Sequence, residues 1–209
     1  MTSFLVVFDV DSTLIRDEVI ELLADAAGKR AEVKAITDAA MAGELDFSSS
    51  LAARVAMLEG VSETVFAETL ARVQLTTGAV ELISAIHSAG GKAAAVSGGF
   101  IQVLEPLAAT LGLDFYRANT LEVSAGALTG KTVGPVIDRA TKAASLAEWA
   151  GQLGLTPSQC IAVGDGANDL EMMKLAGLGV AFNAKPLVRK QADLVLEGED
   201  LGALSALLP

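Results

Sequence analysis

The chain has 209 residues, and its 15 Lys and Arg against 26 Asp and Glu give a formal net charge of −11 at pH 7. This excess of acids argues against a nucleic-acid-binding protein, which needs clustered Lys and Arg, and against docking on anionic membranes. Because 52% of the residues are hydrophobic and 20% are charged, the chain has enough apolar surface to fold, which excludes a disordered protein.

The first apolar run, residues 4–8, is short and continuous, as is typical of a strand buried on both faces of a parallel sheet. Four amphipathic patterns then predict helices over residues 18–27, 29–42, 48–59 and 62–73. We interpret residues 14–75 as a helical cap subdomain that is inserted after the first strand.

Further along the chain, apolar runs over residues 92–96, 160–163 and 178–182 predict strands that alternate with helices over 79–88, 101–111 and 140–152. An alternating pattern over residues 115–136 predicts a small β-hairpin or flap within the core. The sequence therefore predicts an α/β fold, with a Rossmann-like parallel sheet covered by helices on both faces and a core made of residues 1–13 and 76–209.

The sequence shows no targeting signal and contains one cysteine. The start of the chain has no basic segment, and no run approaches ~18 apolar residues, so we expect no transmembrane helix. Cys160 is the one cysteine, which excludes an intramolecular disulfide and a thiolate metal cluster. We therefore expect a cytoplasmic protein. Cys160 is expected to be a small buried hydrophobic residue and Trp149 a helix-packing residue, while His87, with no second His or Cys nearby, is expected to be structural or solvated.

The first polar cluster, Asp9-x-Asp11-x-Thr13, directly follows the first strand. In extended chain, residues i and i+2 point the same way, so two carboxylates would face one small volume. A hard cation such as Mg²⁺ would compensate their repulsion. The alternative interpretation is a solvated turn that caps the next helix.

Two further clusters stand at predicted strand ends, where open parallel sheets bind ligands. Residues 164–169 read Gly-Asp-Gly-Ala-Asn-Asp; Asp169 stands where a dinucleotide fingerprint needs Gly, so that motif is rejected, and a helix N-cap is the alternative. Ser97-Gly98-Gly99 offers a hydroxyl and backbone N–H groups to a phosphate. Lys142, taken alone, has the pattern of a solvated helix residue.

Taken together, these motifs resemble those of the haloacid-dehalogenase superfamily of phosphohydrolases. The first motif matches residues 8–14, the second Ser97, the third Lys142 and the fourth residues 164–169, in the same order. The resemblance extends over essentially the whole chain to the phosphoserine phosphatase family, through Glu18, Met41, Phe47 and Arg54 in the predicted cap.

That resemblance implies Mg²⁺-dependent hydrolysis of O-phospho-L-serine to L-serine and phosphate, the last step of L-serine biosynthesis. It implies that Asp9 is the nucleophile, which forms an aspartyl-phosphate, and that Asp11 is the general acid and base. The ligands of Mg²⁺ would be the Asp9 side chain, the Asp11 backbone carbonyl and Asp165.

The resemblance also assigns the groups around the phosphate. Ser97, the Gly98 N–H and Lys142 would hold the phosphoryl group, and a Lys is a compact charge suited to this task. Asn168 would orient the substrate. Asp169 would hold Lys142 or a metal-bound water.

Substrate choice would come from the cap. Glu18 would take the ammonium of phosphoserine, and Arg54 would take its carboxylate in a bidentate manner. Met41 and Phe47 would form an apolar collar that excludes water. The alternatives are that Glu18 and Arg54 are exposed helix charges and that Met41 and Phe47 are ordinary packing residues. At the level of function, the alternatives are a phosphatase for phosphothreonine or a phosphosugar, and a non-catalytic binding module.

Overall fold

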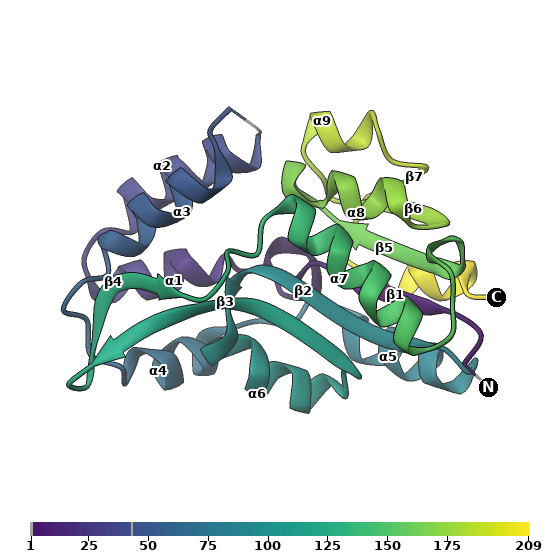
Figure 1. The fold of residues 1–209 in the computed structure, drawn as a ribbon, viewed down its shortest axis with the longest axis horizontal. Coiled ribbons are helices and arrows are strands. Elements are labelled where there is room, and N and C mark those ends of the chain that lie inside the picture. Colours follow the sequence, from purple (N-terminus) through teal and green to yellow (C-terminus); the bar gives the residue numbers. More distant parts are fainter. Residues whose placement is uncertain (1, 43) are drawn as a thin grey trace.

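The computed structural model describes residues 2–42 and 44–209, and its centre is a seven-stranded sheet in the order β4-β3-β2-β1-β5-β6-β7 (Figure 1). Parallel pairing joins six strands: β1 (Leu5–Phe8), β2 (Lys92–Phe100), β3 (Phe115–Ser124), β5 (Cys160–Gly164), β6 (Leu178–Phe182) and β7 (Leu194–Leu196). The remaining strand, β4 (Ala127–Val133), is antiparallel to β3 at one edge of the sheet. The predicted α/β fold with a mainly parallel sheet is confirmed.

Helices cover both faces of the sheet, as predicted. Side chains alternate along β1, so that Leu5 and Val7 pack into one core and Val6 and Phe8 into the other. The first core is completed by α7 (Arg139–Gln152) and α8 (Leu170–Leu175), and the second by α5 (Ala79–Ser88) and α6 (Ile101–Leu111). A short helix, α9 (Pro186–Arg189), follows β6.

The segment after β1 forms four helices: α1 (Val19–Ala26), α2 (Arg30–Met41), α3 (Phe47–Ala56) and α4 (Val65–Arg72). The chain enters and leaves this segment at adjacent points, because the Arg16 N–H donates to the Gln74 carbonyl at 2.9 Å and the Thr76 N–H to the Leu14 carbonyl at 2.9 Å. In Figure 1, α2 and α3 lie together at one end of the molecule. The predicted cap boundaries at residues 14 and 75 stay a proposal.

The hairpin of β3 and β4 reaches from the central sheet to the helical segment (Figure 1). The Gly60 N–H donates to the Leu128 carbonyl at 2.9 Å, and the Leu128 N–H donates to the Val61 carbonyl at 2.8 Å. The hairpin therefore ties the helical segment to the core, a connection that the alternating sequence pattern did not predict.

Two strands differ from the sequence prediction. β2 does not end at Val96 but continues to Phe100, with a register shift against β3, so Ser97-Gly98-Gly99 lies in extended chain. The glycines had suggested a turn because they are common there. β7 was missed because it has only three residues, one of them exposed. Within residues 2–42 and 44–209, no helix has the length and apolar character needed to cross a membrane.

Candidate active site

The chain after β1 makes one tight turn, Val10–Leu14, that buries both acids of the first cluster. Asp9 is 2% exposed and Asp11 is 9% exposed, so the interpretation as a solvated turn is wrong. The turn is fixed from both sides, because the Asp9 N–H donates to the Val163 carbonyl at 2.8 Å and the Thr76 hydroxyl donates to the Thr13 carbonyl at 2.7 Å.

Lys142 on α7 is fully buried beneath Asp9, so it is not a solvated helix residue. Its ammonium lies 2.6 Å from Asp9 Oδ1 and 2.7 Å from Asp169 Oδ1. Burial alone would lower the pKa of Lys142, but Asp169 and Asp9 raise it further, so the net direction is upward and the side chain stays charged. The other oxygen of Asp169 accepts the Gly166 N–H at 3.1 Å. Asp169 thus holds Lys142 in place.

Asp9, Asp165 and Asp169 form a buried acidic triad that is able to bind a metal, since one oxygen from each lies within 4.8 Å of the others. Burial, followed by Asp169, raises the pKa of Asp9 to about 7, and burial, followed by Asp9, raises the pKa of Asp165 well above its usual value. Asp165 Oδ1 is buried without a hydrogen-bond partner, as expected for a ligand atom. Both oxygens of Asp169 already accept hydrogen bonds, which favours Asp9 and Asp165 as the ligands.

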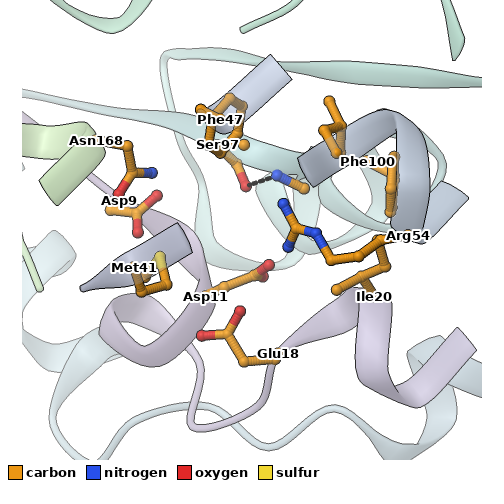
Figure 2. Close-up of a pocket in the computed structure, with 13 residues that line it drawn as sticks. Asp9, Asp11, Glu18, Ile20, Met41, Phe47, Arg54, Ser97, Phe100 and Asn168 are labelled. Carbon is orange, nitrogen blue, oxygen red and sulfur yellow. Dashed lines mark hydrogen bonds between the residues drawn. The ribbon is translucent and has the colours of Figure 1, made fainter. Parts of the chain in front are cut away.

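A pocket opens above this triad, between the strand ends and the helical segment (Figure 2). Ten residues that the sequence analysis singled out line it: Asp9, Asp11, Glu18, Met41, Phe47, Arg54, Ser97, Gly98, Gly99 and Asn168. The carboxylates of Asp11 and Glu18 and the guanidinium of Arg54 point toward the same space in Figure 2. The sequence analysis missed three further lining residues, Ile20, Leu51 and Phe100, which are hydrophobic and so carry no polar signal.

The end of β2 forms one wall of the pocket. The Gly99 N–H donates to the Ser97 hydroxyl at 2.8 Å, which leaves the hydroxyl proton free for a ligand. A Cβ on Gly99 would lie 3.0 Å from Asp11 Oδ2 and 3.0 Å from Ser97 Oγ, so a larger residue there would crowd both groups. The Asn119 side-chain amide donates to the Gly98 carbonyl at 2.8 Å, which fixes the orientation of this peptide group.

Glu18 and Arg54 both belong to the pocket and are not exposed helix charges. Arg54 is 6% exposed, and Figure 2 shows both charged groups directed inward. Burial raises the pKa of Glu18, and burial lowers that of Arg54, while Glu18 and then Asp11 raise it. The pocket therefore offers one anionic and one cationic group on its helical side.

Met41 and Phe47 touch the core across the pocket. A Cβ on Gly166 would come 2.7 Å from Met41 Cε, and a Cβ on Gly98 would come 2.8 Å from Phe47 Cζ. These glycines leave room for the two apolar side chains, so the helical segment is seated on the strand ends. Asn168 lies beside Gly166, and its Oδ1 is buried without a partner.

Two residues near the site had no role in the sequence analysis. Asn119 accepts the Ile137 N–H at 2.8 Å while it holds Gly98, and its only sequence signal is a polar residue in the middle of a strand. Lys185 donates its backbone N–H to the Asp165 carbonyl at 2.9 Å. Burial raises the pKa of both Asp165 and Glu18, and the charge of Lys185 opposes that rise in part. Both residues hold the backbone of a predicted site residue in place, Asn119 that of Gly98 and Lys185 that of Asp165.

The three residues expected to be structural or solvated lie away from the pocket. His87 pairs with Asp114 at 2.9 Å. Cys160 is buried, and burial raises the pKa of its thiol to about 11. Trp149 stacks on Phe115 in the core with ring centres 5.8 Å apart.

The chain is similar to known proteins along nearly its whole length. It is 49% identical to "Phosphoserine phosphatase SerB2" of Mycobacterium tuberculosis and 55% identical to a phosphoserine phosphatase of Streptomyces coelicolor, covering 51% and 46% of those relatives. It thus spans about half the length of these two. It is also 49% identical to a phosphoserine phosphatase of Streptococcus thermophilus, and this match covers 94% of the chain and 92% of the relative.

Solved structures agree with these relatives. A substrate-bound phosphoserine phosphatase complex superposes with a TM-score of 0.97 at 38% identity, with full coverage of both chains. A phospho-aspartyl intermediate analogue of phosphoserine phosphatase gives the same TM-score at 39% identity, also with full coverage of both. The model of one family, the haloacid dehalogenase-like hydrolases, matches residues 6–174, a span that includes the acidic triad, Lys142 and the Ser97 wall of the pocket. The chain therefore belongs to the haloacid dehalogenase-like hydrolase family.

Proposed function

We propose that this chain is a Mg²⁺-dependent phosphoserine phosphatase, which hydrolyses O-phospho-L-serine to L-serine and phosphate in the last step of L-serine biosynthesis. One observation carries the proposal: a single buried pocket places Asp9, Asp11 and the Ser97 wall opposite Glu18 and Arg54. This arrangement matches a substrate with a phosphate at one end and an ammonium and a carboxylate at the other. The names of the relatives and of the substrate-bound structure support it.

Asp9 is the proposed nucleophile. Its carboxylate attacks phosphorus and forms an aspartyl-phosphate, which divides the displacement into two easier steps. Lys142, 2.6 Å from Asp9 Oδ1, favours the ionised form of Asp9 against the burial that raises its pKa. Lys142, Ser97 and the Gly98 N–H hold the phosphoryl oxygens.

Asp11 is the proposed general acid and base. Burial, followed by Glu18 and Asp9, raises the pKa of Asp11 well above its usual value, which favours a protonated carboxyl. A protonated Asp11 can donate to the departing serine oxygen. The resulting carboxylate can then take a proton from the water that attacks the aspartyl-phosphate.

Mg²⁺ fits the donor set, which consists of carboxylate and carbonyl oxygens with an unpartnered atom on Asp165. Asp9, Asp165 and the backbone carbonyl of Asp11 are its proposed ligands. When bound, the ion cancels the repulsion between these acids and the phosphate and stabilises charge on the transferring oxygens.

On the substrate's amino-acid end, Glu18 binds the ammonium, Arg54 binds the carboxylate and Asn168 orients the bound ester. Met41 and Phe47, which contact the core across the pocket, exclude water from the reacting atoms. In this proposal residues 14–75 act as a cap that sets specificity on a core formed by residues 1–13 and 76–209.

Metal binding should depend on pH in a defined direction. In the metal-free protein the pKa of Asp9 rises from 3.8 to about 7, and those of Asp11 and Asp165 also rise, so the folded state binds more protons than the unfolded chain. These three acids therefore lower the free energy of unfolding as pH rises from about 4 through 7. Mg²⁺ binds the ionised acids, so it should raise the Tm more at pH 8 than at pH 5.

Thermal unfolding with and without Mg²⁺ at both pH values measures this difference. Asp165→Asn removes one proposed ligand and should abolish most of the Mg²⁺-induced increase in Tm. Asp38→Asn, on an exposed residue of α2, is the control and should keep it. An Mg²⁺ effect of equal size at pH 5 and pH 8 would contradict the assignment.

Phosphate release tests the function itself. We expect rapid release from phosphoserine with Mg²⁺, loss of turnover with EDTA, and recovery on adding excess Mg²⁺. A panel with phosphothreonine and a sugar phosphate ranks the substrates: a higher kcat/KM for either than for phosphoserine would overturn the substrate. Absence of metal-dependent turnover on the whole panel would leave a binding module and refute the enzyme.

A further inference from the structure

Glu18 and Arg54 carry opposite charges in one buried pocket, yet they do not pair. Within residues 2–42 and 44–209, Arg54 forms no ion pair within 4.0 Å, although each group shifts the pKa of the other. Opposite charges in a site of low polarity attract strongly. Each of the two groups is instead fixed by a hydrogen bond to another residue.

Arg54 is held by Thr37 on the neighbouring helix α2. Thr37 is 2% exposed, and its hydroxyl donates to the Val33 carbonyl at 3.0 Å and accepts from Arg54 Nη1 at 3.1 Å. Arg54 Nε donates to the Ser50 carbonyl one turn earlier at 3.1 Å. These two contacts fix the plane of the guanidinium and leave its remaining N–H groups for the pocket.

Glu18 is held by Ser12 in the turn after β1. The Ser12 hydroxyl donates to Glu18 Oε1 at 2.7 Å, which leaves Oε2 for a ligand. Ser12 has a φ of +58°, in the left-handed region that non-glycine residues rarely adopt. A residue in this region beside a reactive site is commonly kept for a functional reason, and in this conformation the Ser12 hydroxyl reaches Glu18.

We propose that Ser12 and Thr37 are positioning residues that hold Glu18 and Arg54 apart, at the separation that the ammonium and carboxylate of the substrate require. The inference rests on the proposed function. Substrate recognition then has two arms. In the carboxylate arm Thr37 positions Arg54, which binds the substrate's carboxylate, and in the ammonium arm Ser12 positions Glu18, which binds its ammonium. Because the arms are separate, substrates that lack one of the two groups can test each residue by itself.

Four phosphomonoesters form the test. Phosphoserine has both groups, the phosphate ester of 3-hydroxypropanoate has only the carboxylate, phosphoethanolamine has only the ammonium, and ethyl phosphate has neither. KM and kcat are measured with saturating Mg²⁺ for the wild type and each variant. Arg54→Ala provides the full loss of the carboxylate arm for reference.

Thr37→Val keeps the shape of the side chain but removes the acceptor of the Arg54 hydrogen bond. It should raise KM about tenfold for the two substrates with a carboxylate, as expected for a hydrogen bond to a charged group, and change the other two by less than about twofold. Thr37→Ser restores the hydroxyl and should return KM to within about threefold of the wild type. Thr69→Val, at another buried threonine of the helical segment, should leave all four substrates unchanged.

Ser12→Gly removes the hydroxyl at a position where glycine adopts the backbone conformation without strain. It should raise KM about tenfold for phosphoserine and phosphoethanolamine, the two substrates with an ammonium, and spare the other two. Thermal unfolding verifies that each variant is folded at the assay temperature.

The outcomes separate this inference from the function. If the wild type hydrolyses phosphoserine but the two variants change all four substrates equally, or none of them, the positioning roles are overturned while the function stands. If the wild type does not hydrolyse phosphoserine in the presence of Mg²⁺, the proposed function fails first. Opposite selectivity of the two variants, each confined to its own arm, is the supporting result.

Discussion

Asp9→Asn should reduce phosphate release from phosphoserine by about a thousandfold or more, because an amide cannot attack phosphorus and form the covalent intermediate. The loss should fall on kcat, since the groups proposed to bind the substrate, Glu18, Arg54 and Ser97, are unchanged. The amide oxygen can still accept from Lys142, which is 2.6 Å from Asp9 Oδ1, so the fold should be preserved. Stopped assays of phosphate release at saturating phosphoserine measure the effect.

The covalent step has its own readout. Wild-type enzyme quenched in acid during turnover should carry one phosphoryl group on the peptide that contains Asp9, and Asp9→Asn should carry none. Mass spectrometry also verifies that the introduced asparagine has not reverted to aspartate by deamidation, which would give false residual activity. Asp38→Asn, at an exposed acid of α2, is the matched control. Retention of a tenth of the activity by intact Asp9→Asn would remove Asp9 as the nucleophile.

The sequence was sufficient for the parts of the site that lie at strand ends. Asp9, Ser97 and Asp165 each follow or end a short apolar run, and parallel strands bring their carboxyl ends to one edge of the sheet. Spacing along the chain therefore predicts proximity in space. Lys142 shows the opposite case: its bond to Asp9 spans 133 positions, and nothing in its helical surroundings distinguishes it from a surface lysine.

The positions of the Thr37 and Ser12 hydroxyls could not be predicted from the sequence, and the reason is physical in each case. Thr37 lies in an amphipathic helix, where a polar residue is normally exposed, and its burial arises only because α3 packs on α2 and brings Arg54 to it. Ser12 adopts a positive φ that sequence rules assign to Gly or Asn. Both depend on tertiary contacts that override the local preference of the residue.

The net charge of −11 includes several acids that belong to the site and not to the solvated surface. Five of the 26 acids, Asp9, Asp11, Glu18, Asp165 and Asp169, belong to the pocket or the triad beneath it and so do not describe the solvated surface. The cations placed against them are few: Lys142 under Asp9, Arg54 above the pocket and Lys185 beside Asp165. An anionic substrate therefore depends on local positive charge, and removing one of these cations should have a large effect.

Lys142→Met should be the most damaging change to the stability of the metal-free protein. The lysine is fully buried, and its removal leaves Asp9 and Asp169 close together without their cation. Breaking a buried ion pair from one side costs about 3–5 kcal/mol in the free energy of unfolding. Because the pKa of Lys142 is raised, its contribution is fully present at pH 7 and would be lost only above its ordinary pKa near 10.5.

Denaturant unfolding without Mg²⁺ measures this loss, and Lys34→Met, at a lysine whose side chain is 55% exposed, should change stability by less than about 0.5 kcal/mol. The triple variant Asp9→Asn, Lys142→Met, Asp169→Asn removes the stranded charges as well. It should recover most of the stability but none of the activity, because uncharged partners no longer repel each other. If Lys142→Met is as stable as the wild type, or if the triple variant is no more stable than Lys142→Met, the charge of Lys142 does not hold the acidic triad together.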